Sequence, residues 1–107
     1  VGFSRIPEML HNGQRLASEF FGRPFGTLQK GCPADLVVLG YSPPTPLTSR
    51  NLLGHFLFGM NSSMVEHVIT NGNRIVWNKQ LVGIDEGDIM HKASKVAKKL
   101  WGRMHGR

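Results

Sequence analysis

Apolar side chains recur three, four and seven positions apart at the start of the chain, which predicts helix with one apolar face. An Asn-Gly pair interrupts this pattern. The sequence therefore predicts two short helices, over about residues 5–11 and 13–21, with Asn12 capping the second. Ser4 is expected to cap the first helix. Gly22 is expected to end the second, because glycine readily adopts the left-handed conformation found at helix C-termini.

The middle of the chain alternates short β-rich runs with turn residues. Residues 25–28 predict a short strand, and the apolar run at residues 36–39 predicts a buried central strand entered through a turn. Residues 64–70 and 74–77 predict a hairpin, because the Asn-Gly pair between them favours a type I′ turn. A second tight turn, at residues 78–80, leads into the third strand of a meander.

The connection between the central strand and this hairpin is harder to interpret. Residues 42–46 carry three prolines, so they lack the backbone donors of a central strand. Beyond them, Thr48 or Ser49 could cap a short helix that ends near Gly59. An extended segment at residues 55–58 fits equally well, and periodicity does not decide between the two.

The end of the chain carries the best-defined helix of the sequence, over residues 85–105. Asp85 caps it, and Glu86 and Asp88 place negative charge in the first turn, where it complements the helix dipole. The apolar stripe of this helix comprises Ile89, Ala93, Val96, Ala97, Leu100, Trp101 and Met104. The lysines lie mostly off the stripe, so the helix is amphipathic and basic.

The length of the chain bounds its architecture. A chain of 107 residues can form one small domain, whereas a (β/α)₈ barrel needs about 250 residues. We expect an α+β fold with a small, mostly antiparallel sheet of about four or five strands and flanking helices. We treat residues 1–107 as a single domain with three parts: helices at 1–22, strands and a connecting short helix at 25–83, and the terminal helix at 85–105.

Positive charge gathers near the end of the chain. The net charge is +6, and much of the excess lies after Asp88, at Lys92, Lys95, Lys98, Lys99, Arg103 and Arg107. These residues form one basic helix end and not a groove lined by basic and aromatic side chains. We therefore expect a solvated or subunit-facing surface and disfavour nucleic-acid binding.

Cellular location follows from what the sequence lacks. No apolar run approaches the roughly 20 residues that span a membrane, and the first residues carry no signal-peptide pattern, so we expect a cytoplasmic chain with no membrane partner. The chain starts at Val1 and not at methionine, which suggests a fragment or a processed form. The one cysteine, Cys32, cannot form an intrachain disulfide and has no local partner that would activate it, so we expect no catalytic role for it.

The candidate catalytic side chains do not form a recognisable site. The five histidines are His11, His55, His67, His91 and His105, and no two of them have the spacing of a metal site. His55 stands out because it lies in an apolar segment. Its ring is expected either to bond a backbone carbonyl or to face a barrel or a subunit interface. Asp35 is expected to accept backbone N–H bonds at the turn before its strand. We assign no catalytic, cofactor-binding or metal residue in this chain.

Several motifs, in order, resemble the region that follows the catalytic barrel in the metal-dependent amidohydrolase superfamily. They are an apolar helix ending in FG at residues 21–22, GTLQKG at 26–31, GCPADLVVL at 31–39 and VITNGNRIV at 68–76. The superfamily patterns are G-x-L-x-x-G-x-x-A-D-L-V-V-L and V-x-x-V-x-V-N-G-x-x-V. A narrower resemblance, to the SsnA-type aminohydrolases related to chlorohydrolases and to cytosine or guanine deaminases, rests on DLVVL at 35–39, PPTPLT at 43–48, NLLGHFLFG at 51–59, DE at 85–86 and KLW at 99–101.

The resemblance, which covers about residues 8–104, implies a parent enzyme much larger than this chain. Such enzymes combine a metal-bearing (β/α)₈ barrel with a small β-sandwich built from both chain ends. They use a metal-activated water to hydrolyse a C–N or C–Cl bond of a heterocycle. Their metal ligands lie on barrel strands that would precede residue 1. A divalent metal such as zinc or iron is therefore expected in the parent enzyme and not in this chain.

We accordingly interpret the chain as the C-terminal structural part of an amidohydrolase, inactive by itself. Its expected partners are the missing barrel and N-terminal strands, and a second copy that pairs through an exposed sheet edge. Two alternatives stay open: a stand-alone basic module that binds nucleic acid, and an interaction subunit that needs a separate partner chain.

Overall fold

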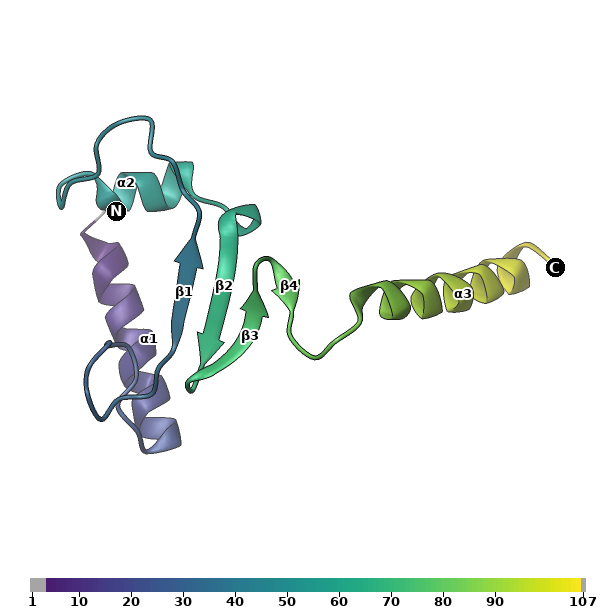
Figure 1. Cartoon of the computed structure of the whole chain (residues 1–107), viewed down its shortest axis with the longest axis horizontal. Helices are drawn as coiled ribbons and strands as arrows, with labels where there is room; N and C mark the ends of the chain where they lie inside the picture. Colours follow the sequence, from purple (N-terminus) through teal and green to yellow (C-terminus); the bar gives the residue numbers. More distant parts are fainter. Residues whose placement is uncertain (1–3, 107) are drawn as a thin grey trace.

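The computed structural model describes residues 4–106, as helices around one antiparallel sheet. The elements are α1 (Arg5–Phe21), β1 (Leu36–Leu39), α2 (Leu52–Gly54), the π-helix η1 (His55–Gly59), the 3₁₀-helix η2 (Ser62–Met64), β2 (Val65–Thr70), β3 (Asn73–Trp77), β4 (Gln80–Leu81) and α3 (Glu86–His105). The four strands lie in the order β1-β2-β3-β4, and each pair is antiparallel (Figure 1). The predicted α+β class and its small antiparallel sheet are confirmed.

The first helix is continuous, so the predicted break at Asn12 is wrong. A glycine inside a helix costs only about 1 kcal/mol relative to alanine, and the apolar face continues on both sides of the Asn-Gly pair. Ser4 has helical angles, φ −61° and ψ −19°, and in the described part of the chain its side chain makes no capping hydrogen bond, so the predicted cap is also wrong. Gly22 ends the helix with φ +67°, as expected.

Residues 25–28 do not form the predicted strand in the described structure. Gly26 has φ +100°, which bends the chain away from an extended path. The Phe25 N–H donates to Ser18 Oγ at 2.9 Å, and the Phe25 ring packs against Phe21 with centroids 5.7 Å apart. This segment is therefore anchored to α1 and not to the sheet. The turn that follows is formed as predicted, with the Cys32 N–H donating to the Gln29 carbonyl at 3.1 Å.

The strand β1 lies at an edge of the sheet, which corrects the prediction of a buried central strand. Within residues 4–106 it pairs with β2 alone, and Val37 is 55% exposed. The paired positions place Val37, Val68, Val76 and Leu81 in one row across the four strands. The apolar run in β1 thus adds Val37 to an aliphatic row across the sheet. This row ends at the outer edge of β1, which pairs with no strand in the described structure.

The β2–β3 hairpin and the meander are formed as predicted. Asn71 and Gly72 both have positive φ, at 50° and 76°, which is the requirement of a type I′ turn. Asn78 and Lys79 repeat this geometry at 50° and 64°, and they lead into β4.

Between β1 and the hairpin, the chain is helical and not extended at residues 55–58. The Thr48 carbonyl accepts the Leu52 N–H at 3.0 Å, which opens the first turn. The Met60 N–H donates to the His55 carbonyl at 2.9 Å, five residues back, which closes a π-turn. Sequence periodicity left these two conformations open because the segment is short and apolar throughout.

The helix α3 stands away from the sheet at one end of the molecule (Figure 1). Asp85 Oδ1 accepts the Asp88 N–H at 3.0 Å, which confirms the predicted cap. Most of the predicted stripe is solvent-exposed, including Val96 and Trp101, whereas Ala97 is half-buried.

The Asp85 cap gives a direct test of α3. Replacing Asp85 with alanine removes the acceptor for the Asp88 N–H and should cost about 1 kcal/mol of helix stability. Hydrogen exchange of the Asp88 amide should then speed up about fivefold. Asp85→Asn keeps a side-chain oxygen and serves as the matched control. An Asp88 amide that exchanges equally in wild type and the alanine variant would contradict the cap.

The described residues contain no buried hydrophobic side chain. The radius of gyration is 19.7 Å, against about 13 Å for a compact chain of this size. None of the helices within residues 4–106 has the length and apolar character needed to cross a bilayer. The apolar faces of α1, the sheet and α3 are therefore left for contacts beyond those the described chain makes with itself.

Candidate functional site

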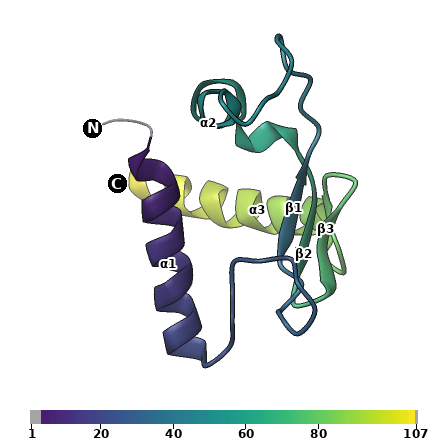
Figure 2. The same cartoon turned by 90° about the vertical axis from the view of Figure 1, so that its left-hand side faces the viewer.

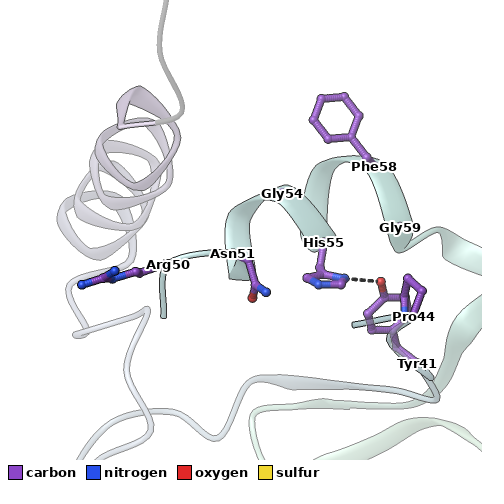
Figure 3. Close-up of a pocket in the computed structure, with 8 residues that line it drawn as sticks. All are labelled: Tyr41, Pro44, Arg50, Asn51, Gly54, His55, Phe58 and Gly59. Carbon is purple, nitrogen blue, oxygen red and sulfur yellow. Dashed lines mark hydrogen bonds between the residues drawn. The ribbon is translucent and has the colours of Figure 1, made fainter. Parts of the chain in front are cut away.

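An open pocket of ≈ 490 Å³ lies between the proline-rich connection and the α2–η1 segment. Tyr41 and Pro44 line it from the connection, and Asn51, His55 and Gly59 line it from the helical segment (Figure 3). It is the one place in the described structure where the histidine that stands out in the sequence meets a cavity, so we take it as the candidate site.

The His55 ring is held at both nitrogens. Nδ1 bonds the Tyr41 hydroxyl at 2.5 Å, and Nε2 bonds the Thr45 hydroxyl at 3.0 Å. A neutral imidazole donates through one nitrogen and accepts through the other, so one hydroxyl accepts and the other donates. The Tyr41 and His55 rings also meet edge to face, with centroids 5.6 Å apart. The ring therefore links the helical segment to the proline-rich connection, a pair of contacts that we call the His55 clamp. Both ring nitrogens are used in these bonds, so neither is free for a metal or a proton transfer.

Two further contacts shape this clamp. Asn51 closes the turn into α2, because its Oδ1 accepts the Thr48 N–H at 2.7 Å and its Nδ2 donates to the Pro46 carbonyl at 2.9 Å. A Cβ at Gly59 would collide with the Tyr41 hydroxyl, so only glycine lets the end of η1 approach Tyr41 this closely. Figure 3 shows the Arg50 and Phe58 side chains directed away from the His55 ring.

The sequence singled out His55 but missed its partners. The ring bonds two hydroxyls and not the backbone carbonyl that was one of the two expectations. Tyr41 and Thr45 lie 14 and 10 residues before His55, outside the range of any helical or strand spacing. The other expectation, a ring that faces a barrel or a subunit interface, stays a prediction.

Asp35 accepts a backbone N–H as expected, but the donor lies in the turn between β2 and β3 and not in the turn before its own strand. Its Oδ1 accepts the Asn71 N–H at 2.7 Å, and the neighbouring Ala34 carbonyl accepts the Gly72 N–H at 3.0 Å. Both bonds join the start of β1 to the β2–β3 turn. The Ala-Asp pair of the ADLVVL motif is thus a structural connection between strands.

Curated relatives share this region of the chain. A 5′-deoxyadenosine deaminase from Methanopyrus kandleri is 31% identical over 86 residues, which cover 80% of this chain and 20% of that protein. A 5-methylthioadenosine/S-adenosylhomocysteine deaminase from Pelotomaculum thermopropionicum is 32% identical over 73% of this chain and 18% of its own length. A deaminase with the same name from Natronomonas pharaonis is 25% identical over 94% of this chain and 23% of its own.

The chain belongs to the amidohydrolase superfamily. It matches the C-terminal part of these larger enzymes and spans about a fifth of their length. No family model matches the chain, and no solved structure matches it either. The narrower likeness to SsnA-type aminohydrolases stays a prediction.

The described residues of this amidohydrolase region do not fit a metal ion. Residues 4–106 hold no group of three or more histidine, cysteine, aspartate or glutamate side chains that could bind one. His67 Nδ1 accepts the Asn78 N–H at 3.1 Å, and its ring stacks on Trp77 with centroids 4.1 Å apart. The sequence predicted a helix ending at residue 11, but His11 lies in the middle of the continuous α1. His91 and His105 lie exposed on α3.

Proposed function

We propose that this chain is the C-terminal structural part of an amidohydrolase that hydrolyses a C–N bond of a small heterocyclic substrate with a metal-activated water. The observation that carries the proposal is the exposure, within residues 4–106, of the apolar faces of α1, the sheet and α3. A segment of this kind supports a neighbouring domain and leaves the chemistry to it. The parent enzyme would bind a divalent metal such as zinc or iron in its barrel and would be cytoplasmic.

The proposed substrate class is an adenosine derivative. The relatives are named as deaminases of 5′-deoxyadenosine and of 5-methylthioadenosine or S-adenosylhomocysteine, which supports a purine amine over the C–Cl alternative. The proposed reaction is attack of water on the amine-bearing ring carbon with release of ammonia.

The proposed partners of the chain are the barrel and the N-terminal strands of the parent enzyme. The support for this is the outer edge of β1, which is unpaired within the described structure and ends the aliphatic row of the sheet. An added strand would pair with this edge and continue the row. In the isolated chain, we expect the same edge to pair with a second copy.

A grafting experiment tests the proposal. The C-terminal fifth of the Methanopyrus kandleri enzyme is removed, and this chain replaces it. We expect ammonia release from 5′-deoxyadenosine to vanish on truncation and to return with the graft, while this chain alone with added zinc or iron stays inactive. A Gly/Ser segment of equal length is the control. A folded graft without turnover would contradict the proposal, and so would turnover by the isolated chain with stoichiometric metal.

A further inference from the structure

The turn between β2 and β3 places an asparagine directly before a glycine on the surface of the molecule. Asn71 and Gly72 are both solvent-exposed, and both have positive φ. The side-chain amide of asparagine is chemically labile, most of all when glycine follows, because no Cβ then shields the next backbone nitrogen. The residues that form the hairpin turn are therefore also a candidate site of covalent modification.

The reaction at such a pair takes place within the chain. The Gly72 nitrogen gives up its proton to water and forms a bond to Cγ of Asn71. The C–N bond of the side-chain amide breaks, and its nitrogen takes up a proton and leaves as ammonia. Water then opens the resulting five-membered imide at either carbonyl, which gives aspartate or isoaspartate. Each product carries one new carboxylate, and the reaction consumes only water.

The start of β1 restrains the nitrogen that must attack. The Gly72 N–H donates to the Ala34 carbonyl at 3.0 Å, so its proton is held in a hydrogen bond. One residue earlier, the Asn71 N–H donates to Asp35 Oδ1 at 2.7 Å, and the carboxylate opposes the negative charge that develops on the attacking nitrogen. Figure 2 shows the entry to β1 beside the β2–β3 turn. Attack is therefore favoured only when the start of β1 separates from this turn.

Two other asparagines separate the contribution of sequence from that of structure. Asn78 has the same φ as Asn71, 50°, and lies in an exposed two-residue turn, but Lys79 follows it. Asn12 is followed by a glycine, Gly13, but lies inside α1, where helical hydrogen bonds hold the backbone N–H groups. Among these three, Asn71 alone combines a following glycine with an exposed turn.

We propose that Asn71 is a site of deamidation and that the contact between β1 and the β2–β3 turn sets its rate. The product places a negative charge on the residue whose backbone Asp35 binds, and like charges repel. Isoaspartate also lengthens the backbone of a two-residue turn, whose length fixes the strand register. Deamidation thus weakens the contact that restrains it, which makes the change one-way. This inference does not depend on the proposed function.

Peptide mapping by mass spectrometry tests the proposal on the whole chain. The protein is incubated at mildly alkaline pH, and samples are cleaved after arginine and lysine at mildly acidic pH. This cleavage places Asn12, Asn71 and Asn78 on separate peptides, which are residues 6–15, 51–74 and 75–79. We expect Asn71 to convert several times faster than Asn78, because the Lys79 side chain hinders attack in the other turn.

Replacing Asp35 tests the control by β1. Without the charge-assisted bond the turn opens more often, so in Asp35→Ala we expect conversion of Asn71 to rise about tenfold while Asn12 stays unchanged. Asp35→Asn keeps an acceptor, and we expect a rise of about threefold. Asp88→Ala removes a carboxylate from α3 and should leave the Asn71 rate unchanged.

Each alternative result has a defined meaning. Equal conversion of Asn71 and Asn78 in the wild type would overturn the site. A rate at Asn71 that neither Asp35 variant changes would overturn its control by β1. If Asn12 accelerates together with Asn71 in Asp35→Ala, that variant has unfolded and Asp35→Asn decides. A rise at Asn71 alone in Asp35→Asn then supports the proposal, and no rise overturns it.

Asn71→Asp tests the effect of the product. It introduces the new charge at position 71, and we expect hydrogen exchange of the Gly72 amide to accelerate about threefold as the bond to Ala34 weakens. Asn78→Asp makes the same change in the other turn and should leave Gly72 exchange unchanged. Equal Gly72 exchange in wild type and Asn71→Asp would overturn the claim that the new charge weakens the contact.

Discussion

Replacing His55 with alanine should destabilise the α2–η1 segment by about 2 kcal/mol. The variant loses the bonds to the Tyr41 and Thr45 hydroxyls, each worth about 1 kcal/mol as a neutral hydrogen bond. It also leaves the partly buried Tyr41 hydroxyl without this partner. The Met60 N–H, which bonds the His55 carbonyl, reports the opening of the π-turn. Its hydrogen exchange should accelerate about 30-fold, because each 1.4 kcal/mol is a factor of ten.

Two variants make the His55 experiment specific. Tyr41→Phe keeps the ring and removes one hydroxyl, so we expect about half the effect in free energy. His91→Ala makes the same substitution at an exposed position on α3, and Met60 exchange should not change. Equal Met60 exchange in wild type and His55→Ala would show that the ring does not hold the segment. That result would favour the other expectation for His55, in which the ring faces a barrel or a subunit interface.

Features determined by a few neighbouring residues could be read from the sequence. The Asn71-Gly72 turn, the Asp85 cap and the helix end at Gly22 each follow from the chemistry of a short stretch. In each of these features the interacting groups lie within a few residues of each other along the chain. For Asp35 the sequence indicated the kind of bond, to a backbone N–H, but not the donor, which lies 36 residues away in the β2–β3 turn.

The errors share a different cause, since each depends on a partner that the local sequence does not specify. The apolar run of β1 indicates burial, but the described chain supplies a neighbour on one side only. Residues 25–28 have strand-like composition and find Ser18 and Phe21 instead of a strand. The clamp around His55 involves hydroxyls that no spacing rule connects to it. Exposed apolar helix faces and an unpaired strand edge are thus expected where the sequence is suited to neighbours that lie outside the described residues.

Asp35→Ala should lower the free energy of unfolding of the sheet by about 2 kcal/mol. The charged carboxylate bonds the Asn71 N–H at 2.7 Å, and bonds to charged groups contribute about 1.5–3 kcal/mol. This bond joins residues 36 positions apart, so its loss weakens the link between the start of β1 and the turn of the hairpin. Urea unfolding followed by the fluorescence of Trp77 measures the effect, in a background where Trp101→Phe removes the signal of α3.

The charge and the acceptor of Asp35 can be separated. Asp35→Asn keeps an oxygen at the same position and should recover about half of the loss, because a neutral acceptor is roughly half as strong as a charged one. Asp88→Ala removes a carboxylate from α3, outside the sheet, and should leave the Trp77 transition unchanged. Full stability in Asp35→Ala would mean that the backbone bond from Gly72 to Ala34 suffices to hold β1. The contribution of the ADLVVL motif to the stability of the sheet would then lie in its apolar strand alone.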